Sequence, residues 1–135
     1  MKITVETTVT APIHAVWHAY TTPEDIIQWN SASDDWHTSK ASVDLREGGA
    51  FSSRMEAKDG RFGFDFAGTY TRVVVHHLLE YSFGDRQASV AFIATPPCVT
   101  VKVEFDAEDT HSVEQQRSGW QAILSNFKRH VERQI

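Results

Sequence analysis

Three kinds of side chain in this sequence could bind a metal or take part in catalysis: the histidines, one pair of adjacent acids and the single cysteine. His14 and His18 lie four residues apart, so on a helix they share one face and offer two nitrogen ligands. A zinc site needs more ligands, so we predict surface histidines, no metal site and no cofactor. Asp34 and Asp35 form a pair of the kind that acts as acid and base, but their polar surroundings favour a solvated loop. Cys98 follows two prolines in an apolar run, which predicts a buried and inert thiol.

None of the short motifs that usually mark an active site occurs in the chain. There is no GxSxG, no HExxH, no phosphate-binding loop and no dinucleotide fingerprint. His76 and His77 are adjacent in the sequence and should point apart, and His37 is predicted to lie at the surface. We therefore predict no catalytic residue, and we favour a non-enzymatic binding protein over an enzyme.

The composition of the chain is that of a single globular domain. Its 135 residues suit one domain, 1–135, and 41% of them are hydrophobic, which is enough to build a core. A net charge of -5 and scattered basic residues argue against a nucleic-acid partner, because such proteins usually carry a basic face. No stretch approaches the ~20 apolar residues of a membrane helix, and the N-terminus has no apolar signal core. We expect no membrane insertion and, by default, a cytoplasmic protein.

Helical patterns stand near the beginning and at the end of the chain. Pro12 and the run Thr22–Pro23 each predict the start of a short helix, following an amphipathic strand over residues 3–9. The last helix is predicted at 113–134, where Ser112 and Gln115 form a capping box. Its apolar residues form one stripe along the helix, namely Trp120, Ile123, Leu124, Phe127 and Val131.

The middle of the chain has the pattern of a β-meander. After a polar loop at 30–40, apolar and polar residues alternate in six strands up to residue 106, and Gly68 marks a bulge or a close backbone approach. Turn signals separate successive strands, at Gly48–Gly49, Asp59–Gly60, Gly84–Asp85 and Pro96–Pro97. A sheet with one apolar face must bury that face, and the terminal helix is the element long enough to cover it.

Four segments together resemble the START-like superfamily, also called SRPBCC, and within it the branch named for the activator of the 90-kDa heat-shock protein ATPase. They are APIHAVWHAYTTPEDIIQW at 11–29, DLREGGAFSSRM at 44–55, GFDFAGTY at 63–70 and GWQAILSNFKRHVE at 119–132. The resemblance runs along essentially the whole chain, and QWNSASDDWHT at 28–38 is typical of one bacterial subgroup. His76–His77 departs from the proline turn of many relatives, which puts the hairpin there in doubt.

The resemblance implies an α+β helix-grip fold, in which a curved antiparallel sheet of about seven strands surrounds the C-terminal helix. It also implies a cavity between sheet and helix that holds lipid-, polyketide- or flavonoid-like molecules in other members. A straight helix cannot contact a curved sheet everywhere, and aromatic and Met side chains suit a planar guest. The predicted lining is therefore Trp29, Trp36, Phe51, Met55, Phe64, Phe66, Phe92, Val101, Trp120, Leu124 and Phe127.

Three functions follow as expectations. The first is weak binding of a small hydrophobic molecule. Polar contacts could come from Asp65, Arg54, Arg72, Tyr70 or Ser53, but the alternation of the strands does not determine which of these side chains face the cavity. The second is a cyclase or hydrolase that uses the same cavity, for which Asp65 and Arg54 are the residues to examine. The third is a stress-related chaperone-interaction module, which the name of the branch suggests. Whether any protein partner exists is left open.

Overall fold

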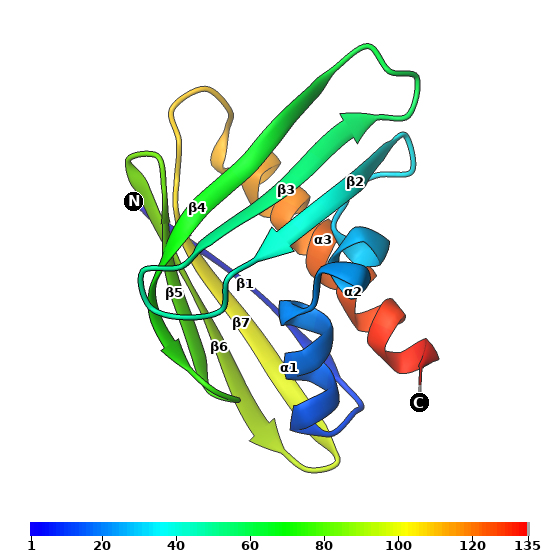
Figure 1. Ribbon diagram of the computed structural model, residues 1–135, viewed down its shortest axis with the longest axis vertical. Coiled ribbons are helices and arrows are strands. Elements are labelled where there is room, and N and C mark those ends of the chain that lie inside the picture. Colours follow the sequence, from blue (N-terminus) through cyan, green and yellow to red (C-terminus); the bar gives the residue numbers. More distant parts are fainter. Residues whose placement is uncertain (135) are drawn as a thin grey trace.

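Seven antiparallel strands form one curved sheet in the computed structural model of the protein, which describes residues 1–134 (Figure 1). The order in the sheet is β1-β7-β6-β5-β4-β3-β2, so strands β2 to β7 pair with their neighbours in the chain. The strands are β1 Lys2–Val9, β2 Trp36–Val43, β3 Ala50–Ala57, β4 Gly63–Val74, β5 Leu78–Phe83, β6 Arg86–Thr95 and β7 Cys98–Asp106. The helices are α1 Ile13–Thr21, α2 Pro23–Trp29 and α3 Val113–Arg133. The predicted helix-grip architecture is confirmed.

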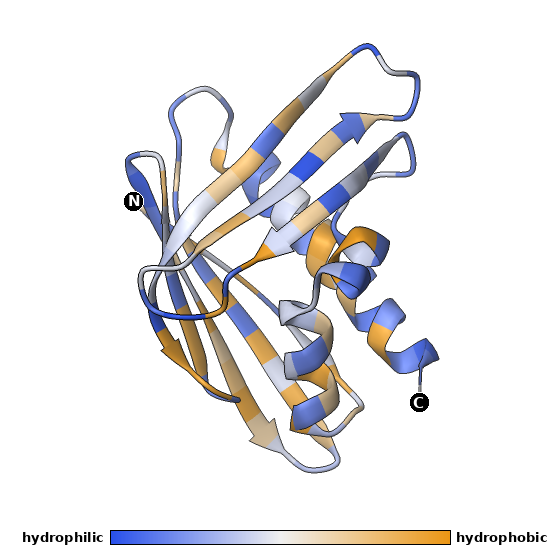
Figure 2. Ribbon diagram, in the orientation of Figure 1, coloured by the Kyte–Doolittle hydropathy of each residue, from blue (hydrophilic) through white to orange (hydrophobic). Residues whose placement is uncertain are grey.

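The strands alternate between hydrophobic and hydrophilic residues, as Figure 2 shows along β3, β4 and β7. In β7, Val99, Val101, Val103 and Phe105 are buried, whereas Lys102 and Glu104 between them are exposed. This period of two places one set of side chains on the inner, concave face of the sheet and the other set in solvent.

Strand β2 begins earlier than the sequence predicts. Residues 30–40 are predicted as a loop, but Trp36 already pairs with Ala57 of β3, and the strand continues to Val43. The segment looks polar because His37, Ser39 and Lys40 are exposed, and because the register shifts between Thr38 and Lys40. A bulge interrupts the alternation on which the prediction rests.

The structure shows the conformation at the two positions that the sequence left open, His76–His77 and Gly68. The β4–β5 hairpin exists, and His76 adopts a positive φ of 66° in its turn. Gly68 is a site of close approach, because a Cβ there would lie 2.2 Å from the Ser82 carbonyl oxygen and 2.8 Å from the Phe51 ring. The bulge occurs farther along β4, between Tyr70 and Arg72. The absence of a side chain at Gly68 lets the Phe51 ring lie against the sheet.

The start of α3 is fixed by the predicted capping box. The Ser112 hydroxyl accepts a hydrogen bond from the Gln115 backbone N–H at 3.1 Å, and the Gln115 side chain accepts one from the Ser112 N–H at 3.1 Å. The buried Gln116 side chain donates to the carbonyl oxygens of Glu108 and His111 at 3.1 and 2.9 Å. These bonds determine where the helix leaves the sheet.

Substituting Ser112→Ala is expected to lower the free energy of unfolding by about 1 kcal/mol, because the Gln115 N–H loses its side-chain acceptor. Urea denaturation followed by circular dichroism measures this change. Ser118→Ala is the matched control, since Ser118 is exposed inside the same helix and alanine has the higher helix propensity. Equal stability of the wild type and Ser112→Ala would show that the cap contributes nothing.

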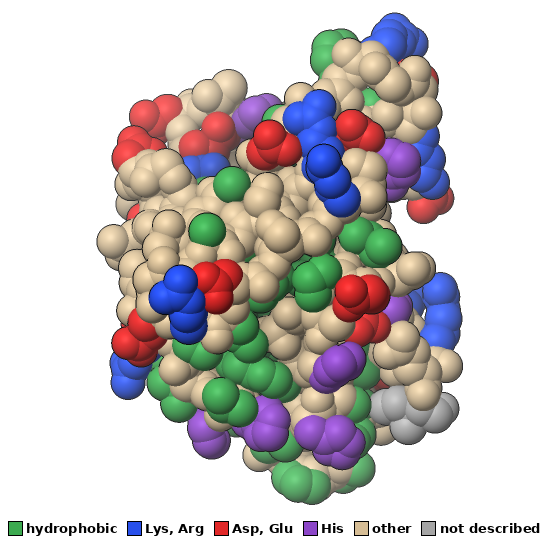
Figure 3. All heavy atoms as spheres, viewed as in Figure 1, with side chains coloured by type: hydrophobic (Ala, Val, Ile, Leu, Met, Phe, Trp, Pro, Cys, Tyr) green, Lys and Arg blue, Asp and Glu red, His purple; other side chains and the backbone are tan. Residues whose placement is uncertain are grey.

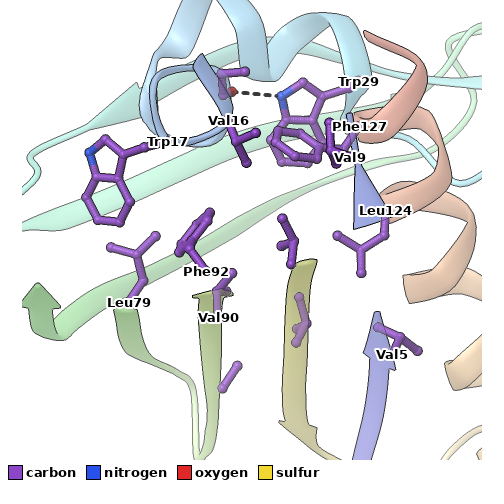
Figure 4. Packing of buried hydrophobic residues seen from close by; sticks show 14 of the residues in the cluster. Val5, Val9, Val16, Trp17, Trp29, Leu79, Val90, Phe92, Leu124 and Phe127 are labelled. Carbon is purple, nitrogen blue, oxygen red and sulfur yellow. Dashed lines mark hydrogen bonds between the residues drawn. The ribbon is translucent and has the colours of Figure 1, made fainter. Parts of the chain in front are cut away.

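The solid part of the core lies beneath α1. Val16 and Trp17 of α1 point at Leu79, Val90 and Phe92 on the sheet (Figure 4). Trp29 of α2 donates a hydrogen bond from its indole nitrogen to the Ala19 carbonyl oxygen at 3.0 Å, which ties α2 to α1. Helix α2 packs against β2, whereas the far ends of β3 and β4 extend away from α1 (Figure 1). The core is therefore concentrated at one end of the molecule.

Candidate functional site: a cavity between the sheet and two helices

A cavity of about 490 Å³ lies between the inner face of the sheet and helices α2 and α3, with Tyr20 of α1 also in its wall. This volume falls within the range of small-molecule pockets, roughly 300 to 1,000 Å³. Eight of the predicted lining residues surround it, namely Trp29, Trp36, Phe51, Met55, Phe64, Phe66, Trp120 and Leu124. The rings of Trp36 and Phe64 are 6.0 Å apart, and the Phe64 side chain is 50% exposed, which places the mouth of the cavity beside this pair.

Three predicted lining residues do not line the cavity. Phe92, Val101 and Phe127 lie in the solid core, where their exposed fractions are 3%, 0% and 0%. The ring of Tyr20 shields two of them, since it packs against Phe92 at 5.5 Å and Phe127 at 5.1 Å between centroids. Tyr20 takes their place as a wall of the cavity. The prediction was wrong for these three residues. The sequence pattern identifies side chains that face inward, but it does not distinguish those that pack in the core from those that border a cavity.

The aromatic residues of the wall hold one another in place. Phe66 stacks on Phe83 with centroids 5.3 Å apart, and Phe51 meets Tyr81 edge to face at 5.0 Å. Trp120 of α3 stacks on Phe105 at 3.9 Å with an interplanar angle of 8°. Contacts of this kind restrict the rotamers of the side chains in the wall.

All three tyrosines of the chain, Tyr20, Tyr70 and Tyr81, line this cavity. Their hydroxyl groups make no hydrogen bond to another described residue, and no side-chain oxygen within residues 1–134 is both sealed from solvent and unpaired. Each hydroxyl therefore keeps some accessible surface, and the cavity is the space that all three side chains line. Burial raises the pKa of Tyr70 to about 12 and raises the pKa of Tyr20 and Tyr81 as well. At neutral pH all three are uncharged phenols that can donate a hydrogen bond.

The tyrosines are expected to resist ionisation until the protein unfolds. Above pH 10 an unfolded tyrosine releases its proton while the folded protein retains it, so stability is unaffected below pH 10 and falls above it. For Tyr70 the fall spans pH 10 to about 12 and amounts to about 1.4 kcal/mol per pH unit. The ultraviolet absorbance of phenolate and the circular dichroism should then change together during an alkaline titration. A phenolate midpoint near pH 10 in folded protein would contradict this placement.

Arg86 also lines the cavity, and the sequence analysis missed it. The sequence pattern placed the strand at Val90, after the Gly84–Asp85 turn, but β6 begins at Arg86. Extending the alternation back from Phe92 and Val90 through Ala88 would have placed Arg86 on the inner face. The guanidinium carbon of Arg86 lies 4.5 Å from the Phe83 ring centroid.

The polar candidates of the sequence analysis divide between the two faces of the sheet. Ser53 and Tyr70 line the cavity. Arg54 and Asp65 do not, because they alternate with inward-facing residues, and they form a 3.6 Å ion pair across β3 and β4. Arg72 is likewise absent from the wall. The proposed enzymatic role of Arg54 and Asp65 in the cavity is therefore wrong for these two residues.

The histidines and the acids Asp34 and Asp35 are not among the residues that line the cavity. His18 and His130 both reach Asp25, at 3.5 and 2.9 Å, so this carboxylate joins α1, α2 and α3. His37 faces Glu56 at 3.6 Å. Asp35 accepts a hydrogen bond from the Ser33 hydroxyl at 2.6 Å, which lowers the pKa of its carboxyl group. Within residues 1–134 no three His, Cys, Asp or Glu side chains cluster in a way that could hold a metal ion.

The family to which the chain belongs follows from a match over nearly its whole length. Residues 10–132 match the family described as Activator of Hsp90 ATPase homolog 1-like protein. The chain belongs to this family. Its members share the START-like architecture predicted from the four sequence segments, and the seven strands and the long terminal helix fit that architecture.

Solved structures of proteins from three organisms have the same fold as this chain. An AHSA1-like protein from Aeromonas hydrophila is 47% identical, with a TM-score of 0.93, over 99% of this chain and 94% of that one. A protein from Cytophaga hutchinsonii is 44% identical, with a TM-score of 0.85, over 98% and 93% of the two chains. A Chromobacterium violaceum protein at 21% identity and a TM-score of 0.87, over 98% of both chains, shows the fold alone. Among curated proteins none matches this chain.

On the face of the protein shown in Figure 3, hydrophobic side chains and histidines gather in the lower half. Basic and acidic side chains are interspersed on this face, and no extended patch of one sign is visible. Within residues 1–134, no helix combines the length and apolar character that crossing a membrane requires.

Proposed function

We propose that this AHSA1-like protein binds one small and largely apolar molecule in the cavity between its sheet and α3. The observation that carries the proposal is an open space of about 490 Å³ walled mainly by aromatic and aliphatic side chains. A closed core normally leaves few voids larger than a water molecule. Leaving so much apolar surface unpacked costs stability, and a guest molecule that fills the space would recover that free energy.

The composition of the wall favours binding over catalysis. Among the described residues that line the cavity there is no Asp, Glu, His, Lys or Cys. A general acid or base would have to come from a tyrosine, and burial raises the pKa of all three. A catalytic pKa works best near the operating pH, so these phenols suit hydrogen bonding better than proton abstraction.

The affinity for a purely apolar guest should be weak. A ligand of about 20 non-hydrogen atoms gaining roughly 0.3 kcal/mol per atom binds with about 6 kcal/mol, which corresponds to tens of micromolar. Flat aromatic walls favour planar molecules of lipid-, polyketide- or flavonoid-like chemistry. A cytoplasmic location remains a prediction from the sequence.

Titration with a flavone, followed by amide resonances, tests this proposal. The expected result is saturable shifts of residues in the wall, including Trp29, Phe64 and Trp120. A disaccharide of similar size is the control and should shift none of them. Shifts that are absent from these residues, or that are equal for both compounds, would refute a hydrophobic binding site.

A second candidate function is interaction with a heat-shock ATPase of the Hsp90 class. The match of residues 10–132 to the family named for that activity favours it. The described residues show no element that we can assign to such a contact, so we rank it below ligand binding. A stoichiometric complex with the ATPase and a raised hydrolysis rate would support this second candidate. No change in hydrolysis at saturating protein would remove it.

A further inference from the structure

Arg86 is the cation in the cavity wall among the described residues. It lies at the start of β6, opposite Phe83 of β5, and it is half-buried. Its side chain turns inward, as do Ala88, Val90 and Phe92 after it on the same strand. A charged side chain in a mainly apolar wall loses hydration, and such groups normally face an opposite charge.

No carboxylate among residues 1–134 forms an ion pair with Arg86. One guanidinium nitrogen donates a 3.3 Å hydrogen bond to the Asp106 carbonyl oxygen, and the Phe83 ring covers one side. The Asp106 carboxylate binds Lys2 at 2.7 Å and the Gln87 N–H at 2.8 Å instead. The Glu108 carboxylate binds His111 at 2.8 Å. The acids near Arg86 are thus already engaged, and most of its five N–H donors remain available.

Two tyrosine hydroxyls accompany Arg86 on the same face of the sheet. Tyr81 lies directly opposite Ala88, two residues from Arg86, and Tyr70 lies directly opposite Tyr81. Side chains related in this way are direct or diagonal cross-strand neighbours. The positive charge of Arg86 acts on Tyr81, since it partly offsets the burial that raises the pKa of this phenol. A guanidinium and two uncharged phenols therefore border one polar corner of an apolar cavity.

We propose that the molecule bound here is an amphipathic carboxylic acid, whose carboxylate pairs with Arg86 and accepts a hydrogen bond from Tyr81. Its apolar body then lies along Phe51, Phe66 and Trp120 toward the mouth. The inference rests on the proposed function and specifies the chemistry of its ligand. One guanidinium balances the single charge of a carboxylate and matches its planar geometry, whereas a dianionic phosphate would keep an unpaired charge in the cavity.

Two probes with the same ring system test the inference, namely 2-naphthoate and 2-naphthalenemethanol. Wild-type protein should bind the acid about 10-fold more tightly than the alcohol, because a hydrogen bond to a charged group is stronger than a neutral one. The Arg86→Gln variant should bind the two probes equally. Tyr81→Phe should weaken binding of the acid and leave the alcohol unchanged. Arg61→Gln, an exposed charge on the β3–β4 hairpin, is the matched control and should change neither affinity.

The outcomes separate this inference from the function on which it rests. Equal wild-type affinities for acid and alcohol would overturn the carboxylate assignment and leave hydrophobic binding intact. Binding of neither probe would overturn both. Because Arg86→Gln removes a packed side chain, its fold is checked by amide spectra. If the variant does not fold, the chemical shift of the wild-type Arg86 Nε–Hε resonance is measured instead. It should change when 2-naphthoate is added and stay unchanged with 2-naphthalenemethanol. No change with either compound would refute the pairing of Arg86 with the carboxylate.

Discussion

Replacing Gly119 by phenylalanine is expected to weaken ligand binding about 30-fold while stabilising the free protein by about 1 kcal/mol. Gly119 lies in α3 and lines the cavity, and a Cβ built there meets no atom within 4 Å. A phenyl group would enter space that the ligand uses, and the overlap would cost the complex about 2 kcal/mol. Without ligand, the same substitution removes a helix-destabilising glycine and buries new apolar surface.

Isothermal titration with 2-naphthoate and urea denaturation without ligand measure the two effects. Gly119→Ala is the matched control, because it gives the helix about 1 kcal/mol of propensity but adds only a methyl group to the cavity. It should bind within about 3-fold of the wild type, a difference below 1 kcal/mol. A destabilised Gly119→Phe protein would show that the space beside α3 is already filled.

Substituting Phe127→Ala is expected to lower the free energy of unfolding by about 3 to 5 kcal/mol. Phe127 has no exposed surface and packs between Tyr20 and Trp29, with centroids 5.1 and 4.9 Å away. Its removal leaves a hole in the solid core, which the surrounding rings cannot close fully. The loss is large compared with the stability of a typical domain, and the variant should unfold at much lower urea concentrations.

Phe64→Ala is the comparison for Phe127→Ala. Both phenylalanines were predicted to line the cavity, but Phe64, on β4, is 50% exposed at the mouth of the cavity. Phe64→Ala should cost about 0.5 kcal/mol, as most surface substitutions do. Similar costs for the two variants would contradict the division of the protein into a solid end and a hollow end.

Alternation and helix-capping signals predicted the strands and helices and their order, and the family resemblance implied the helix-grip fold that they form. Ser112 and Gln115 located the start of α3, and the turn signals separated strands that pair with their neighbours in the chain. The exception was β2, where a bulge after Thr38 hides the period of two. Local rules succeed here because most contacts in a meander join adjacent strands.

The walls of the cavity could be predicted only in part. The period of two correctly indicates that Phe66 and Val101 both face inward, but not that Phe66 borders the cavity whereas Val101 is fully buried in the core. That difference depends on how the sheet curves relative to the helices, which is a tertiary property. Arg86 was missed for a local reason, because it stands directly after a turn and no apolar residue precedes it on its strand.

Isotope-filtered NOE spectroscopy of bound 2-naphthoate most directly tests whether a guest occupies this cavity. Met55 and Leu124 line the cavity from opposite sides, one on β3 and one on α3, whereas Val101 lies in the solid core. We predict cross-peaks from the naphthalene protons to the methyl groups of both Met55 and Leu124, and none to those of Val101. Cross-peaks confined to exposed methyl groups such as those of Ile93, with none to Met55 or Leu124, would contradict the account.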